Sequence, residues 1–167
     1  MLSGLVRAAR HFVDPANLAV NAEILARSQY LDGSAELIGR AISDRLLLVQ
    51  GGDPVHYPDF MFQYREAANF PWVSQAAWLY AQMVEAGHAT AHLADYQRAQ
   101  AVFRPDIYRS ALGPIGATLP GASSKLEGGI SAPTGVGSIQ GRLILTADSF
   151  FDGQSFDPDI YSGLLAE

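Results

Sequence analysis

The sequence predicts a mostly α-helical fold with one short β-hairpin and a long loop rich in glycine and proline. Apolar residues recur at helical spacing through most of residues 1–112. Residues 113–141 hold eight of the sixteen glycines and three of the nine prolines, with almost no charge. In residues 142–167, two apolar or aromatic runs flank Asp152-Gly153, a pair typical of tight turns. We therefore expect a helical region, a loop segment, and a hairpin with a tail, all within one domain.

Three short helices are expected first. Apolar residues at positions i, i+3, i+4 and i+7 predict a helix over residues 2–13. Asp14 followed by proline is typical of an N-cap and first helical position, which predicts a second helix over residues 15–27. Ser34 is the expected cap of a third helix over residues 34–42. The short links between them favour an antiparallel or right-angled cluster.

The middle of the chain combines one strand with three further helices. The apolar run LLLV at residues 46–49 ends in two glycines and predicts a short strand. In residues 69–87, NFPWVSQAAWLYAQMVEAG, a helix is expected to start near Pro71. Apolar residues occupy two adjacent stripes of that helix, so it should be buried on more than one side. Prolines then favour two more helices, over residues 90–103 and 105–112.

The last third of the chain changes texture. A loop as long as residues 113–141 is uncommon in a compact domain unless it is functional or lies over another body. In residues 142–156, RLILTADSFFDGQSF, the runs on either side of Asp152-Gly153 predict a hairpin whose turn is formed by that pair.

Composition and charge exclude several classes of function. Of the 167 residues, 49% are hydrophobic and 17% charged, which is typical of a globular chain with a real core. Eleven basic residues against 17 acidic ones give a net charge of -6, with no cluster of Lys and Arg to neutralise phosphates. Nucleic acid and anionic membranes are therefore poor partners. The absence of cysteine excludes disulfides, thiol catalysis and thiolate metal sites.

The sequence shows no targeting signal. The N-terminal stretch MLSGLVRAARHFVDP is too polar and too short for the apolar region of a signal peptide. No run approaches the roughly 18 apolar residues that a membrane span needs. From the sequence as written we expect no membrane insertion by this chain itself, and its localisation stays open.

Two acidic or histidine-containing patterns could bind metal, and each has a simpler interpretation. His88 and His92 are four residues apart, with Asp95 one turn further on, so a helix could bring them together around zinc. No HExxH glutamate is present, and Gly87 suggests a helix end, so a solvated polar face is favoured. Positions 1, 5, 6 and 12 of a calcium loop are matched by Asp148, Asp152, Gly153 and Asp159. Positions 3 and 9 are Phe150 and Phe156, so a turn between extended segments is favoured instead.

Other motifs for cofactors or catalysis fail on context. Gly135, Gly137 and Gly141 have a GxGxxxG spacing, but they precede an apolar run instead of following a strand and opening a helix. No GxSxG nucleophile elbow occurs. We therefore expect no cofactor and no catalytic residues, and an enzyme of unknown class stays only as a third alternative.

The order of several motifs resembles a known family. DPAN, EILARSQYLDGSAELIGRAI, NFPWVSQAAWLYAQMVEAG, FRPDIYRSAL, SKLEG and DSFFDGQSFDPD follow one another as in the C-terminal portion of nitrate/bicarbonate-type solute-binding proteins of ABC transporters. Cytoplasmic nitrate sensors built on the same fold are similar. The FPW and FFDG elements are the more specific parts. The departure is length, because those proteins have two α/β lobes around an anion cleft and this chain resembles only their last part.

The resemblance implies a role. It implies part of a two-lobed, type II periplasmic-binding-protein-like fold that is not an enzyme and serves uptake of nitrate, bicarbonate or a similar small anion. The alternative is a stand-alone cytoplasmic sensor or interaction module that binds a regulatory protein. The implied partners are the N-terminal lobes, which would lie upstream of Met1, and a transporter permease. The ligand-binding residues stay unknown.

The surplus of aromatic residues fits this picture. If the tail packs against absent lobes, an interaction surface is expected at Phe70, Trp72, Trp78, Phe150 and Phe151. Such a surface on an isolated chain would favour a homodimer. The alternative is that these aromatics form the chain's own core, where aromatic residues are most often found.

Overall fold

The computed structural model describes residues 1–58, 60–61 and 63–166 and divides the chain into two compact units. Unit 1 comprises Ser3–Ala68 and unit 2 comprises Asn69–Glu167. The fold is mostly helical with two small antiparallel sheets, as the sequence predicted for its class. The boundary between the units follows contacts, whereas the divisions expected at residues 112 and 141 follow changes in composition.

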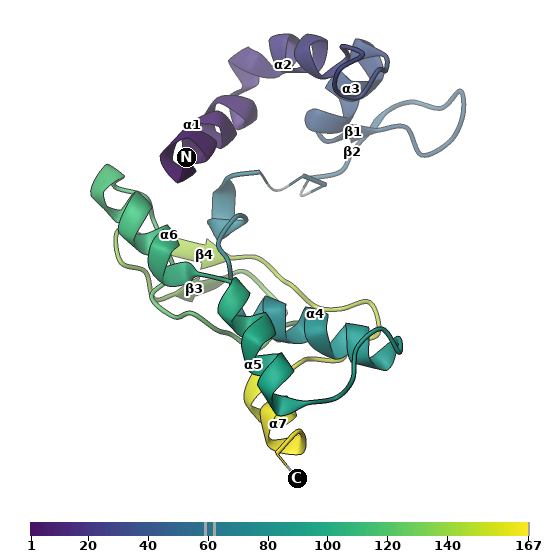
Figure 1. Cartoon of the computed structure of the whole chain (residues 1–167). Helices are drawn as coiled ribbons and strands as arrows, with labels where there is room; N and C mark the ends of the chain where they lie inside the picture. Colours follow the sequence, from purple (N-terminus) through teal and green to yellow (C-terminus); the bar gives the residue numbers. More distant parts are fainter. Residues whose placement is uncertain (59, 62, 167) are drawn as a thin grey trace. The chain divides into compact units, whose positions relative to one another are not determined.

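Unit 1 begins with short helices (Figure 1). They are α1 (Leu2–Val13), a 3-10 helix (Pro15–Asn17), α2 (Leu18–Leu25) and α3 (Ala35–Ile42). The carboxylate of Asp14 accepts a hydrogen bond from Ala16 N at 3.0 Å, and the hydroxyl of Ser34 accepts one from Leu37 N at 3.4 Å. Both expected caps are thus confirmed. The second expected helix starts as a 3-10 turn and ends at Leu25.

The small sheet of unit 1 corrects one expectation. β1 (Arg45–Leu46) pairs antiparallel with β2 (Val55–His56). The strand predicted over residues 46–49 is wrong beyond Leu46, because the chain turns there and Gly52 N donates to Val49 O at 3.0 Å. Leu48 and Val49 are consequently exposed. A 3-10 helix, Arg65–Ala67, closes the unit.

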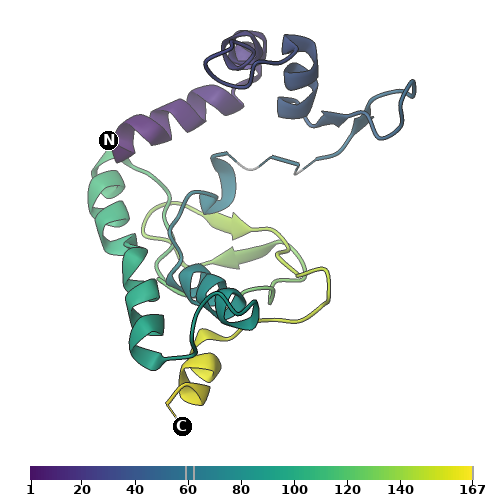
Figure 2. The same cartoon turned by 45° about the vertical axis from the view of Figure 1, so that its right-hand side comes forward.

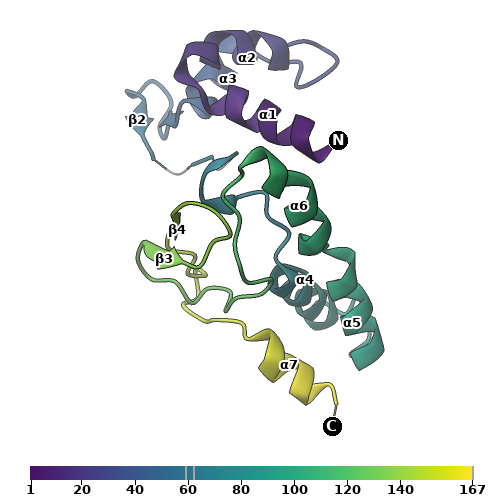
Figure 3. The ribbon, with the colours of Figure 1, turned by 90° about the vertical axis from the view of Figure 1, so that its left-hand side faces the viewer.

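Unit 2 contains the longer helices and the second sheet. Its elements are α4 (Val73–Glu85), α5 (Leu93–Val102), α6 (Pro105–Leu112), a 3-10 helix (Gly113–Ile115), β3 (Thr134–Val136), β4 (Leu143–Leu145) and α7 (Pro158–Leu164). α6 follows α5 along one side of the unit, as Figure 2 and Figure 3 both show. The helices expected over residues 90–103 and 105–112 are confirmed with slightly shifted ends.

The first turn of α4 and its buried face anchor unit 2. The helix begins one residue after Trp72, so Pro71 precedes the cap and does not open the helix. Its buried face consists of four small residues and Tyr80, and Ala77 and Ser74 are fully buried. The outer stripe of Leu79 and Met83 is about half exposed, at 48% and 49%. The expected burial therefore holds for the small residues and Tyr80, and not for Leu79 and Met83.

An aromatic core joins α4, α5 and α7. Tyr96 is 1% exposed and lies 5.8 Å from Tyr80 and 5.4 Å from Tyr161, measured between ring centroids. Its hydroxyl donates to the carbonyl of Pro158 at 2.8 Å, and burial raises the pKa of Tyr96 to about 12. α7 is thus held by rings and one buried hydrogen bond. The sequence prediction did not include this helix.

The hairpin of unit 2 lies elsewhere than predicted. β3 and β4 pair antiparallel, with Thr134 opposite Leu145 and Val136 opposite Leu143. Asp152-Gly153 forms a turn with Gly153 at φ +71°, but the segment after it forms an isolated bridge with the long loop. Phe156 exchanges two backbone hydrogen bonds with Glu127, at 2.8 and 3.1 Å. The partner of each run is set by tertiary contacts, which the local turn signal does not contain.

Candidate functional site

The five aromatic residues expected at an interaction surface fall into two groups. Phe70 and Trp72 are buried within unit 2, at 2% and 5% exposure, with ring centroids 4.9 Å apart in an edge-to-face contact. Trp78 and Phe150 are half-buried and stacked at 5.1 Å, and Phe151 is completely exposed. The core interpretation thus describes the first pair, and the three others lie where a partner could reach them.

The accessible aromatics surround a cavity. A hollow of about 270 Å³ is lined by Gln75, Trp78, Leu79, Phe103, Glu127 and Phe150. Its walls are predominantly apolar. We use the name aromatic face for four of the lining side chains together with the exposed neighbour of Phe150: Trp78, Leu79, Phe103, Phe150 and Phe151. Phe150 is fixed because it packs over Gly128, where a Cβ would lie only 2.8 Å from the Phe150 ring.

A buried polar network lies next to this cavity. The hydroxyl of Ser74 donates to Glu127 Oε1 at 2.6 Å and accepts a hydrogen bond from Lys125 N at 3.1 Å. Lys125 Nζ donates to Glu127 Oε2 at 2.6 Å and also to Asp148 Oδ2. Asp148 Oδ1 accepts from Ile130 N at 2.8 Å.

The burial of this network defines what it can do. Glu127 is 6% exposed and Ser74 is 0% exposed, so both side chains are largely shielded from bulk solvent. Glu127 lies against the first turn of α4 through Ser74, where the positive end of the helix dipole favours a carboxylate. The network therefore joins the long loop to α4 and holds the floor of the cavity. Its chemistry is structural.

A second polar contact fixes the same loop. The Arg109 guanidinium donates to the carbonyls of Pro120 and Gly121 at 2.9 and 3.1 Å, and to that of Ala122. It also donates to the Ser123 hydroxyl at 3.0 Å and lies 5.0 Å from the centroid of the Phe70 ring. The segment between residues 120 and 127 is thus irregular in backbone conformation and tightly bonded to helices.

The two patterns considered for metal binding are not assembled. α4 ends at Glu85 and α5 begins at Leu93, so His88 and His92 do not share a helix. His92 lies 3.5 Å from Asp95, which is itself paired with Arg98 at 2.8 Å. Within residues 1–58, 60–61 and 63–166, no three His, Asp or Glu side chains are grouped as metal ligands.

The acidic residues of the calcium-like loop go to separate partners. Asp148 bonds Lys125 and Ile130, whereas Asp152 accepts from Gln154 N at 3.0 Å. Asp159 lies in the first turn of α7, where Asp157 is the cap. These side chains serve turns and helix ends.

The glycine pattern belongs to the hairpin. Gly135 lies in β3, and Gly137 and Gly141 lie in the connection to β4, with Gly141 at φ +71°. No helix follows a strand there to receive a pyrophosphate. In the described part of the chain, no helix has the length and apolar character needed to cross a membrane.

One of three comparisons with known proteins identifies a similar fold. No protein-family model and no curated protein matches the chain. One solved structure is similar, the periplasmic nitrate-binding protein NrtA from Synechocystis PCC 6803, with a TM-score of 0.71 and 18% sequence identity. The match covers 99% of this chain and 39% of the nitrate-binding protein. At this identity the likeness concerns the fold, which is that of a portion of a periplasmic-binding-protein-like molecule.

Sequence reasoning missed the polar network. Lys125 is the chain's one lysine, and Glu127 is the one acidic residue of the loop segment 113–141. Two opposite charges two residues apart in an otherwise uncharged loop were a signal of buried pairing. Their partners Ser74 and Asp148 are far away in sequence and gave none.

Proposed function

We propose that this chain acts as the C-terminal part of a non-enzymatic solute-binding protein that serves ABC-type uptake of nitrate, bicarbonate or a similar small anion. The observation that carries the proposal is the fold match over 99% of the chain to a periplasmic nitrate-binding protein. The order of the sequence motifs supports the same assignment independently of the fold match.

The charges of unit 2 support a structural role within such a protein. Lys125 is bonded to two carboxylates, and Arg109 is bonded to loop carbonyls. Arg98 and Arg104 each pair with an aspartate, at 2.8 and 2.6 Å. Because these four cations are already engaged, we propose that the donors for a small anion come from another part of the protein. We propose that the aromatic face packs against that part.

Growth of a deletion strain tests the proposal. Cells that lack the coding sequence should grow poorly when nitrate is scarce and is the sole nitrogen source, or when bicarbonate is the limiting carbon source. Ammonium or abundant carbon dioxide should restore growth, and so should the wild-type gene. Normal growth on both scarce anions would contradict an uptake role. If expression of nitrate-assimilation genes changed in such cells while uptake stayed normal, the sensor alternative would replace it.

A further inference from the structure

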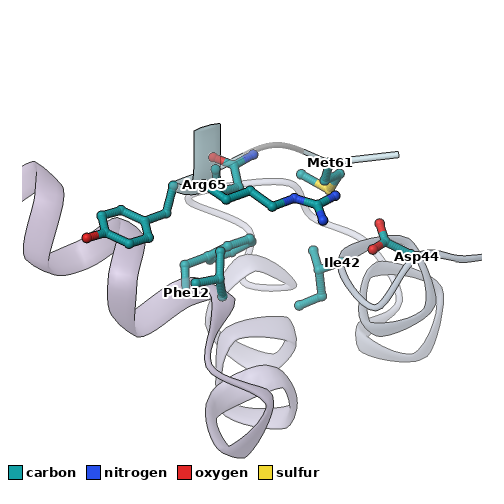
Figure 4. Close-up of a pocket in the computed structure, with 8 residues that line it drawn as sticks. Phe12, Ile42, Asp44, Met61 and Arg65 are labelled. Carbon is teal, nitrogen blue, oxygen red and sulfur yellow. The ribbon is translucent and has the colours of Figure 1, made fainter. Parts of the chain in front are cut away.

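Unit 1 contains a cavity that the proposed function does not use. It has a volume of about 240 Å³ and is lined by Phe12, Val13, Ile42, Asp44, Met61, Gln63, Tyr64 and Arg65 (Figure 4). The ends of α1 and α3 form part of its wall, and Met61, Gln63, Tyr64 and Arg65 form the rest together with Asp44. At about 30 Å³ per water molecule, the volume equals roughly eight waters. A small organic molecule fits such a space.

One side chain in this cavity has an unmet requirement. The Oδ1 atom of Asp44 is buried and has no hydrogen-bond partner among the described residues. Buried carboxylate oxygens without a partner are costly, and most native examples are explained by a bound water, ion or ligand. Asp44 is also held in place by its backbone, whose nitrogen donates to Ala41 O at 3.2 Å and whose oxygen accepts from Tyr57 N at 2.7 Å. The backbone that carries this carboxylate is therefore fixed at the wall.

A positively charged side chain, Arg65, lines the same cavity as Asp44. Figure 4 shows the Arg65 side chain extending from its backbone toward the side of Met61 and Asp44. Arg65 has an interaction of its own, yet a guanidinium has five donors and can serve more than one acceptor. A ligand with only a positive charge would be attracted by Asp44 and repelled by Arg65. A ligand with only a negative charge would be attracted by Arg65 and repelled by Asp44.

Apolar side chains line much of the rest of the cavity, and the Tyr64 side chain is held in place. Phe12, Val13, Ile42 and Met61 offer aliphatic, aromatic and thioether surface. Tyr64 is oriented by Arg10, whose Nε donates to the tyrosine hydroxyl at 2.6 Å and whose guanidinium lies 5.2 Å from the ring centroid. Apolar surface combined with convergent polar groups that fix orientation is typical of small-molecule sites, and four of the eight lining residues here are polar or charged.

From this arrangement we propose that the unit 1 cavity binds a small zwitterion, an α-amino acid with a branched aliphatic side chain. The ammonium group bonds the Asp44 carboxylate, the carboxylate of the ligand lies at Arg65, and its side chain contacts Phe12, Val13 and Ile42. The ligand adds no net charge, so both wall charges are satisfied together. This site lies within unit 1 and does not depend on the proposed role in anion uptake.

Calorimetric titration of the full chain tests the site with three probes of the same shape. L-leucine has both charges, 3-methylbutylamine lacks the carboxylate, and 4-methylpentanoate lacks the ammonium group. We expect saturable binding of leucine, and at least tenfold weaker binding of each analogue. Absence of leucine binding at millimolar concentration would overturn the proposal, and so would equal binding of leucine and the amine.

Variants locate the site. Asp44→Asn keeps the shape, and asparagine tolerates the left-handed backbone at this position, where φ is +56°. It should weaken leucine binding at least tenfold, whereas Asp53→Asn, at an exposed aspartate of the same unit, should not. Ile42→Trp should abolish binding by filling the cavity. Circular dichroism of each variant checks that the helices are retained. Equal leucine affinity of the Asp44→Asn and Asp53→Asn variants would place the ligand elsewhere and refute the site.

Discussion

Replacing Lys125 by methionine removes the ammonium group that bonds both Glu127 and Asp148. The side chains of Lys125 and Glu127 are 16% and 8% exposed, so the pair is largely shielded from water. Removing one partner of a buried ion pair costs about 3 to 5 kcal/mol, because the other charge stays buried. Asp148 is 25% exposed and keeps its bond to Ile130 N, so it can be partly solvated. We therefore expect Lys125→Met to lower the free energy of unfolding by about 3 kcal/mol, the lower end of this range.

Urea denaturation followed by tryptophan fluorescence measures this loss, since both tryptophans, Trp72 and Trp78, lie in unit 2. Arg98→Met is the matched control, because Arg98 and Asp95 form an exposed pair whose loss should cost less than about 1 kcal/mol. Adding Glu127→Gln to Lys125→Met should recover part of the loss, since the uncharged amide can still accept from Ser74. If Lys125→Met cost no more than Arg98→Met, the network would not stabilise unit 2 as argued.

Four further predictions concern association, pH, a glycine and the anion. Phe151→Ser should shift any dimer toward monomer, since burying a phenylalanine contributes about 2 kcal/mol to association. The control variant Ile160→Ser, on α7, should leave the dimer unchanged. Sedimentation of the wild-type chain as a monomer at high micromolar concentration would exclude the dimer. The folded-state pKa of Tyr96 is about 12, above its ordinary value of 10, so its contribution to stability is complete below pH 10 and is lost as the pH rises toward 12. Tyr96→Phe should flatten this alkaline loss in urea titrations, and an unchanged profile would remove Tyr96 as its source. Gly128→Ala should destabilise unit 2 by more than about 1 kcal/mol, because φ is +75° and the added Cβ would meet Phe150 and Gln154, whereas Gly135→Ala has open space; equal stability of the two variants would contradict this. Calorimetry should show no micromolar affinity of this chain alone for nitrate or bicarbonate, and such affinity would mean that it holds a complete anion site.

Local signals along the chain predicted every α-helix of the described residues except α7. Asp14 and Ser34 act through hydrogen bonds to residues two and three positions away, so the sequence alone contains both partners of each cap. The same signal was present at Asp157, whose carboxylate accepts from Asp159 N at 2.9 Å and precedes a proline. α7 could therefore have been predicted by the rule that found the second helix.

Contacts between distant segments account for what the sequence did not predict. The apolar run Leu143–Leu145 pairs with Thr134–Val136, and Phe156 bonds to Glu127, although Asp152-Gly153 forms the turn between these runs. Among the aromatics, Trp72 and Trp78 are only six residues apart, yet one is buried and the other half-buried. Exposure depends on which loop covers each ring, and the loop is placed by Arg109 and Lys125 through bonds that no local pattern specifies.

The initial rate of uptake of labelled nitrate and bicarbonate tests the proposed role most directly. It should be measured at micromolar anion in cells that lack the coding sequence, with and without the wild-type gene restored. We expect a large fall in the initial rate for at least one of the two anions. The wild-type gene should reverse this fall, and the Lys125→Met variant should reverse it poorly. Identical initial rates for both anions in the presence and absence of the gene would contradict it.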